Sequence, residues 1–108
     1  MNHDLASLHC KALEGHAAMD AAEIAAYLKA SANWSLNAGA IEKKFEFADY
    51  HHTMAFVNAV AWIAHREDHH PDIAFGYNRC TVRFNTHSVG GISLNDFICA
   101  AKVDALNL

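Results

Sequence analysis

Two stretches of the chain alternate between hydrophobic and polar residues, which is the pattern of a strand with one covered face. Residues 34–47 predict a hairpin that turns at Gly39, where glycine supplies the positive φ that a tight loop often needs. Lys43 interrupts the hydrophobic face of the second arm, so it is expected near a sheet edge. Residues 79–86 alternate in the same way, and a short strand is expected before them around residues 73–77. These patterns indicate an antiparallel sheet with one covered and one polar face.

Three further stretches have hydrophobic residues every three or four positions, as on one side of a helix. Asp20 is expected to begin the first helix, and Ser93 the last, where Asp96 has the spacing of a capping box. The longest helix is expected at residues 50–67, with Asp49 as its N-cap, and must end before Pro71, the only proline. The predicted order is therefore helix, two strands, helix, two strands, helix.

This order predicts an α+β domain of two layers, with a four-stranded antiparallel sheet and helices on one face. Residues 1–108 are interpreted as a single domain in which residues 1–19 form an N-terminal extension. The helix at residues 50–67 has an apolar stripe wider than one sheet face requires, which indicates a second partner such as another subunit. The stripe comprises Met54, Val57, Val60, Ala61 and Ala64, flanked by Phe56 and Ile63. We therefore expect a homodimer or a homotetramer.

Composition narrows the possible functions. The chain has 108 residues, of which 53% are hydrophobic, so it can bury a core without a metal or disulfides. A net charge of −4 argues against a nucleic-acid partner, because phosphate binding begins from a basic patch. No apolar run approaches the ~20 residues that span a membrane, and the first residues do not resemble a secretory signal. The three cysteines form no C-x-x-C pair, so we expect a reducing cytoplasm.

Histidine is the unusual residue type, with nine in the chain and six of them between residues 51 and 87. His69 and His70 lie where the long helix ends at Pro71, and His87 follows the end of a strand. Loop ends on a rigid scaffold are common places for catalytic groups. An imidazole has an ordinary pKa of about 6.5 and can both give and take a proton near neutrality. Two or three imidazoles around one pocket would make an acid/base set.

Other interpretations of these residues remain open. The histidines could simply be solvated loop residues. His65 and His69 have the i, i+4 spacing that lets two imidazoles share a metal, but Arg66 stands where a metalloprotease motif has its glutamate. We therefore predict no metal. Asp96 could serve only as a helix cap, as part of a site, or as both.

A set of motifs in residues 66–96 resembles the pterin-4a-carbinolamine dehydratase family. The motifs are Asp68-His69-His70-Pro71-Asp72, Tyr77-Asn78, Thr86-His87, Gly91 and Asp96. Weaker similarity extends through Trp34, Asp49 and the long helix, and residues 9–15 look like the N-terminal segment of bacterial members. The resemblance implies a four-stranded antiparallel sheet with helices on one face, in agreement with the predicted order.

The resemblance also implies an activity. The family removes water from 4a-hydroxytetrahydropterin and gives the quinonoid dihydropterin, which recycles the cofactor of aromatic amino-acid hydroxylases. His69 and His87 then look like the general acid/base pair, and His70 like a group that orients the pterin. The residues expected to bind or support the substrate are Asp68, Pro71, Tyr77, Asp96 and His65. No cofactor is implied, and an aromatic amino-acid hydroxylase is a possible partner.

Two positions depart from the family pattern. Many members have a carboxylate where this chain has His65, and an arginine where it has Asn95. Some members also act as dimerisation cofactors of a transcription factor. The alternative function is therefore a protein-binding or dimerisation module of the same fold with weak or no dehydratase activity.

Overall fold

A computed structural model describes residues 2–106 of the chain, with side chains from Asp4 onward, and its centre is a four-stranded antiparallel sheet. The strands are β1 (Ser35–Asn37), β2 (Ala40–Glu46), β3 (Asp72–Phe75) and β4 (Arg79–Phe84). Their order across the sheet is β1-β2-β4-β3, and every neighbouring pair is antiparallel. The predicted α+β class and the order of the elements are confirmed.

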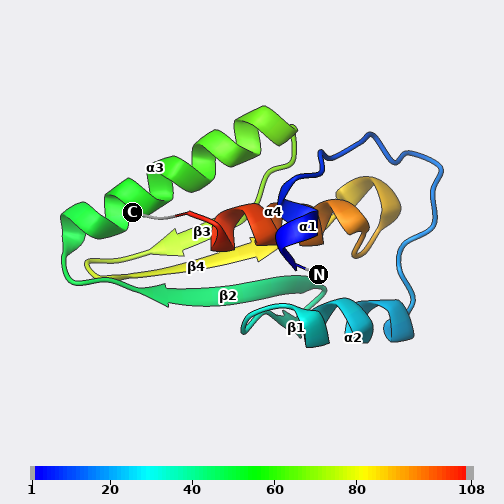
Figure 1. The fold of residues 1–108 in the computed structure, drawn as a ribbon, viewed down its shortest axis with the longest axis horizontal. Helices are drawn as coiled ribbons and strands as arrows, with labels where there is room; N and C mark the ends of the chain where they lie inside the picture. Colours follow the sequence, from blue (N-terminus) through cyan, green and yellow to red (C-terminus); the bar gives the residue numbers. More distant parts are fainter. Residues whose placement is uncertain (1, 107–108) are drawn as a thin grey trace.

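The helices pack around this sheet as Figure 1 shows, with α3 and α4 crossing the same side of it. They are α1 (Asn2–Ala6), α2 (Ala21–Ala30), α3 (Tyr50–Glu67) and α4 (Leu94–Asp104), with a short 3-10 turn, η1 (His87–Val89), after β4. The predicted caps are confirmed at Asp20, Asp49 and Ser93, each of which accepts a hydrogen bond from the first turn of its helix. No helix within residues 2–106 is long and apolar enough to cross a membrane.

The core lies between the covered face of the sheet and helices α3 and α4. Val82 and Phe84 alternate inward from β4, and Phe56 and Val60 meet them from α3. Part of the wide stripe on α3 is therefore explained by packing within one chain. Trp62, which the stripe did not include, is instead 60% exposed on the outside of α3.

Lys43 does not lie near an edge as predicted, because β2 is an inner strand of the sheet. Its ammonium Nζ lies 2.8 Å from Oδ1 of Asp104 and 5.0 Å from the centre of the Phe45 ring. The other oxygen of Asp104 accepts a hydrogen bond from Nε1 of Trp34 at 2.9 Å. One carboxylate at the end of α4 therefore satisfies two polar groups at the margin of the core.

Replacing Asp104 with alanine is expected to lower the free energy of unfolding by about 2 kcal/mol, because it removes a half-buried carboxylate and leaves Lys43 and Trp34 without their shared acceptor. Urea denaturation followed by tryptophan fluorescence measures this change. Glu46→Ala, at an exposed position on the open face of β2, is the control and should change the free energy by less than about 0.5 kcal/mol. Equal effects of the two variants would contradict the role assigned to Asp104.

The strand predicted around residues 73–77 is confirmed, but it begins one residue earlier and ends two residues earlier. β3 spans Asp72–Phe75, and Tyr77 falls in the turn to β4, which the amide of Gly76 closes by donating to the carbonyl of Arg79 at 3.0 Å. The pairing of Phe75 with Cys80 is the last of the ladder. Tyr77 is therefore held at the tip of the β3–β4 hairpin, and this placement matters for the site.

Candidate active site

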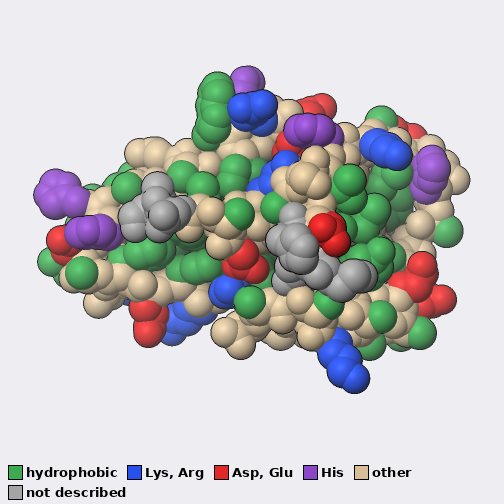
Figure 2. Space-filling view, viewed as in Figure 1, with side chains coloured by type: hydrophobic (Ala, Val, Ile, Leu, Met, Phe, Trp, Pro, Cys, Tyr) green, Lys and Arg blue, Asp and Glu red, His purple; other side chains and the backbone are tan. Residues whose placement is uncertain are grey.

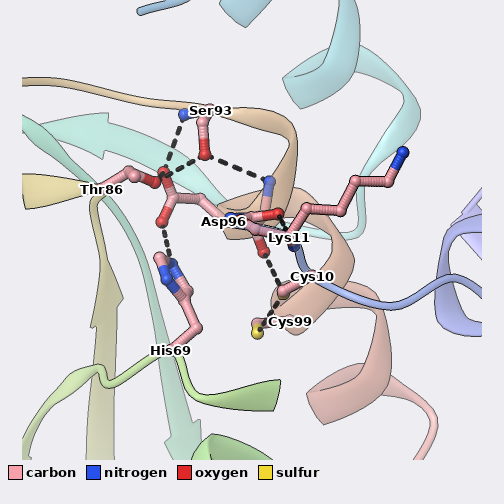
Figure 3. Close-up of polar contacts among 8 residues, drawn as sticks. Cys10, Lys11, His69, Thr86, Ser93, Asp96 and Cys99 are labelled. Carbon is pink, nitrogen blue, oxygen red and sulfur yellow. Dashed lines mark hydrogen bonds and ion pairs between the residues drawn. The ribbon is translucent and has the colours of Figure 1, made fainter. Parts of the chain in front are cut away.

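His69 and Asp96 are joined directly, although 27 residues separate them in the sequence. Nε2 of His69 lies 2.6 Å from Oδ1 of Asp96, as Figure 3 shows. The His69 ring stacks on Phe84 with centres 5.9 Å apart and planes 8° apart, and its side chain is 11% exposed. Since a carboxylate only accepts hydrogen bonds, Nε2 carries the proton of this contact. A neutral His69 ring then has Nδ1 as its proton acceptor.

Asp96 is fully buried and has a partner for each of its oxygens. Its Oδ2 accepts from Oγ1 of Thr86 at 2.8 Å and from the amide of Ser93 at 2.9 Å, while Oδ1 faces His69. Ser93 and Asp96 form the predicted capping box. One carboxylate therefore both begins α4 and holds an imidazole, so the two interpretations of Asp96 from the sequence are not exclusive.

A cleft of about 310 Å³ lies against His69. It is lined by the end of α3 with the residues after it, by the loop after β4, by Asn95, and by residues 10–14 of the N-terminal extension. Among the residues of the sequence motifs, Asp68, His69 and Thr86 line it directly. The cleft is therefore assembled from three distant parts of the chain around a carboxylate-held imidazole.

Glu67, which the sequence did not single out, is a second buried acid at this cleft. Burial raises its pKa, but the hydrogen bonds from the amide of Cys10 and from His9, with the charge of Lys102, outweigh burial and leave the pKa lowered. The amide of Cys10 lies 2.7 Å from Oε1, and Nδ1 of His9 lies 3.0 Å from Oε2. Glu67 is therefore held ionised by groups that the N-terminal extension brings to it.

The other two predicted catalytic histidines, His70 and His87, are exposed and are not among the residues that line this cleft, although each is adjacent in sequence to a residue that does. His87 is the first residue of η1, directly after Thr86, in a loop closed by the pairing of Thr86 with Gly91. His70 follows His69 and is exposed, as is Asp68, which ends α3 with a left-handed backbone at φ 52°. Pro71 is half-buried between His70 and β3. The backbones of these residues thus flank the His69–Asp96 pair.

Tyr77 and His65 are not brought to the cleft within this chain. Tyr77 is 62% exposed, its carbonyl accepts from Thr53 near the start of α3, and its ring lies 6.4 Å from that of Tyr50. His69 follows the other end of α3, and an 18-residue helix is about 27 Å long. His65 is exposed, with its ring 5.4 Å from that of Trp62. The expected contact of Tyr77 with a substrate held by His69 therefore does not arise in one copy of the chain.

The histidines of the chain do not gather into one cluster on the face seen in Figure 2, where their side chains are spread along the molecule. Within the described part of the chain, no group of three or more histidine, cysteine, aspartate or glutamate residues is arranged to hold a metal ion. The His65–His69 spacing thus has no further ligand among those residues. The pair that is joined, His69 with Asp96, is an imidazole held by a buried carboxylate.

Comparison with known sequences shows which proteins the chain resembles. The sequence profile of the family described as "Pterin 4 alpha carbinolamine dehydratase" matches residues 17–106. The "Putative pterin-4-alpha-carbinolamine dehydratase" of Nitrosospira multiformis is 53% identical over 104 residues, covering 95% of this chain and 92% of that protein. A protein of the same name from Bdellovibrio bacteriovorus is 60% identical over 88 residues, covering 78% and 73% of the two chains.

Solved structures give the same result. The crystal structure of a "transcriptional coactivator/pterin dehydratase" from Brucella melitensis matches with a TM-score of 0.78 and 31% identity, covering 82% of this chain and 96% of that one. A pterin dehydratase-like protein described as a RuBisCO assembly factor in the alpha-carboxysome matches with a TM-score of 0.56 and 26% identity, covering 67% and 83%. The fold, the motif residues and the extent of these matches together place the chain in the pterin-4-alpha-carbinolamine dehydratase family.

Proposed function

We propose that this protein is an active dehydratase that removes water from a 4a-hydroxytetrahydropterin, such as 4a-hydroxytetrahydrobiopterin, in a reducing cytoplasm. The observation that carries the proposal is the buried Asp96 carboxylate 2.6 Å from His69 at the edge of a small polar cleft. An imidazole oriented by a carboxylate is a common form of general acid or base. Family membership supplies the substrate class on which this chemistry would act.

The reaction consists of one bond cleavage and two proton movements. The C4a–O bond of the carbinolamine breaks, and the departing hydroxyl takes up a proton and leaves as water. The proton on N5 is lost, and the electron pair of the N5–H bond forms the C4a=N5 double bond of the quinonoid dihydropterin. An acid at the hydroxyl and a base at N5 are therefore sufficient, and the substrate is neither oxidised nor reduced.

We assign the base to His69. With Nε2–H donated to Asp96, Nδ1 of the neutral ring is the atom that would accept the N5 proton. The imidazolium formed in this step would be stabilised by the carboxylate, which is buried and therefore weakly screened. Thr86 and the amide of Ser93 keep that carboxylate in place through Oδ2.

We assign the acid to His87 and an orienting role to His70. Both are exposed next to residues that line the cleft, so each can exchange protons with water between turnovers. His87→Ala is expected to lower kcat by about 100-fold, at the lower end of the range for a general acid, because water can substitute in part at an exposed position. A rate that stays within twofold of wild type would remove His87 from this role.

The proposed function is tested by following the decay of 4a-hydroxytetrahydrobiopterin spectrophotometrically. We expect decay faster than the uncatalysed rate, proportional to the protein concentration, and unchanged after dialysis against EDTA. Folded protein that leaves the uncatalysed rate unaltered would contradict the proposal. Loss of the acceleration on dialysis, restored by a divalent metal, would instead support the metal site considered from the His65–His69 spacing.

A protein-binding role is the second candidate function. Two structural relatives have names that describe a coactivator and an assembly factor, and Trp62 leaves a large hydrophobic side chain in solvent on α3. We also propose self-association as a dimer or tetramer, which sedimentation analysis would measure, and an aromatic amino-acid hydroxylase as a partner, which co-purification would detect. Co-purification of a partner with protein that is inactive in the dehydration assay would favour the binding role.

A further inference from the structure

The N-terminal extension contains a segment that the family profile does not include. The profile begins at residue 17, whereas residues 10–14 line the cleft against His69. We call residues 9–16 the strap. In Figure 1 the strap is part of the blue trace that runs from α1 around the start of α4 toward α2. A wall of the candidate active site is therefore made by residues that precede the part of the chain matched by the family profile.

One anchor of the strap is Asn95, the second residue of α4. The amide nitrogen of Lys11 donates to Oδ1 of Asn95 at 3.1 Å, and Nδ2 of Asn95 donates to the carbonyl of Lys11 at 2.7 Å. A single buried side chain thus satisfies both main-chain groups of one strap residue. An arginine has no acceptor and could not make the first of these bonds.

Further anchors hold the strap at both ends. At its start, the amide of Cys10 and the ring of His9 bind the two oxygens of Glu67. Beyond its other end, the amide of Met19 donates to the carbonyl of Ile92 at 2.8 Å. The strap is therefore fixed against α3 on one side and against the loop before α4 on the other, with the cleft beneath its first half.

The strap also keeps the cleft small. The volume of about 310 Å³ is near the lower limit for small-molecule sites. A bicyclic pterin ring with a short substituent suits such a volume, whereas a pterin extended by an aromatic amide and glutamate does not. Since the strap is one wall, moving it would enlarge the space available to the ligand.

Resting on the proposed function, we propose that the strap is a specificity wall, positioned by Asn95, that restricts the site to unconjugated reduced pterins and excludes pteroylglutamates. Asn95 is a positioning residue in this proposal, because it acts through the main chain of Lys11. Its side-chain amide supplies both the acceptor and the donor that the strap requires.

The test uses the full-length chain with Asn95→Leu, which has a similar volume and removes both hydrogen bonds to Lys11. The position of the strap is measured by cross-linking, because Sγ of Cys10 on the strap lies 3.5 Å from Sγ of Cys99 on α4. Diamide oxidises the two thiols to a disulfide and is itself reduced to the hydrazine. Mass spectrometry of the Cys10–Cys99 peptide then gives the rate of cross-linking. Asn58→Leu, at an exposed position on α3, makes the same substitution away from the strap and is the control.

We expect Asn95→Leu to slow the cross-linking about tenfold, as the loss of two hydrogen bonds implies, and Asn58→Leu to leave it unchanged. Equilibrium binding of 7,8-dihydrobiopterin and 7,8-dihydrofolate gives the selectivity. Wild type should prefer dihydrobiopterin by about tenfold or more, and Asn95→Leu should reduce this preference to about twofold.

Three results would overturn the proposal: wild type that binds both pterins equally, Asn95→Leu that cross-links at the wild-type rate, or slower cross-linking with unchanged selectivity. Failure of the proposed function is a separate result. It would be seen as wild type that selects between the two pterins but does not accelerate dehydration. Wild type that binds neither pterin would contradict both proposals.

Discussion

Replacing His69 with alanine is expected to lower kcat for dehydration of 4a-hydroxytetrahydrobiopterin by about 10³-fold, with a change in KM of less than about threefold. The reason is that His69 is the one motif histidine that is both largely buried and held by a buried carboxylate. A positioned general base typically contributes 10²–10⁴-fold to a rate. Water that fills the space left by the imidazole is not a base held in position by Asp96, so it does not replace His69. Steady-state kinetics near pH 7 measure the change.

The control for this variant is His65→Ala, which removes an exposed imidazole one helical turn earlier on α3. It should retain activity within about twofold of wild type. Because the His69 ring also stacks on Phe84, the thermal unfolding midpoint of His69→Ala must be measured as well. Folded His69→Ala with more than a tenth of the wild-type kcat would show that another group takes the proton.

Local features of the fold could be predicted because their causes lie within a few residues. Asp20 caps α2 through the amide of Glu23, three positions away, and Ser93 is paired with Asp96 at the same spacing. Strand alternation is local in the same sense. By contrast, the position of Lys43 could not be predicted, because its partner Asp104 lies 61 residues later in the sequence. The strand order, which makes β2 an inner strand, also depends on contacts between distant segments.

The same difference between local and long-range causes applies to the residues of the site. The importance of His69 and Asp96 could be inferred from the motif, but their direct contact depends on β4 and α4 meeting at Thr86 and Ser93. Glu67 carried no signal in the sequence, because a glutamate at the end of a helix is ordinarily a solvated residue. Its burial depends on residue 10 in the N-terminal extension, and nothing in the sequence indicated where that extension packs.

For Tyr77 the sequence suggested a contact that the fold does not make, because Tyr77 and His69 are close in the sequence but far apart in the structure. Eight residues separate it from His69, and the strand β3 between them carries it to the other end of the sheet. A strand advances about 3.3 Å per residue, so even a short one moves its ends well beyond the reach of one small ligand. A second copy of the chain is the arrangement in which Tyr77 could still approach a pterin.

Replacing Asp96 with asparagine is expected to lower kcat by about 10³-fold while the fold is retained. The amide oxygen can still accept from Thr86 and from the amide of Ser93, so the cap of α4 survives, with a loss in the free energy of unfolding of about 1–2 kcal/mol. The amide nitrogen, however, then faces Nε2 of His69 as a donor. The imidazole must move its proton to Nδ1, and the atom assigned as the base is no longer an acceptor.

This change of tautomer is directly measurable, because the ¹⁵N chemical shifts of the His69 ring distinguish a protonated Nε2 from a protonated Nδ1. We expect Nε2–H in the wild type and Nδ1–H in Asp96→Asn. Thr86→Val, which removes one bond to the same carboxylate but leaves its charge facing His69, should keep the wild-type tautomer and lose less than about tenfold in kcat. If Asp96→Asn changed the tautomer and remained fully active, the base would have to be sought in another residue.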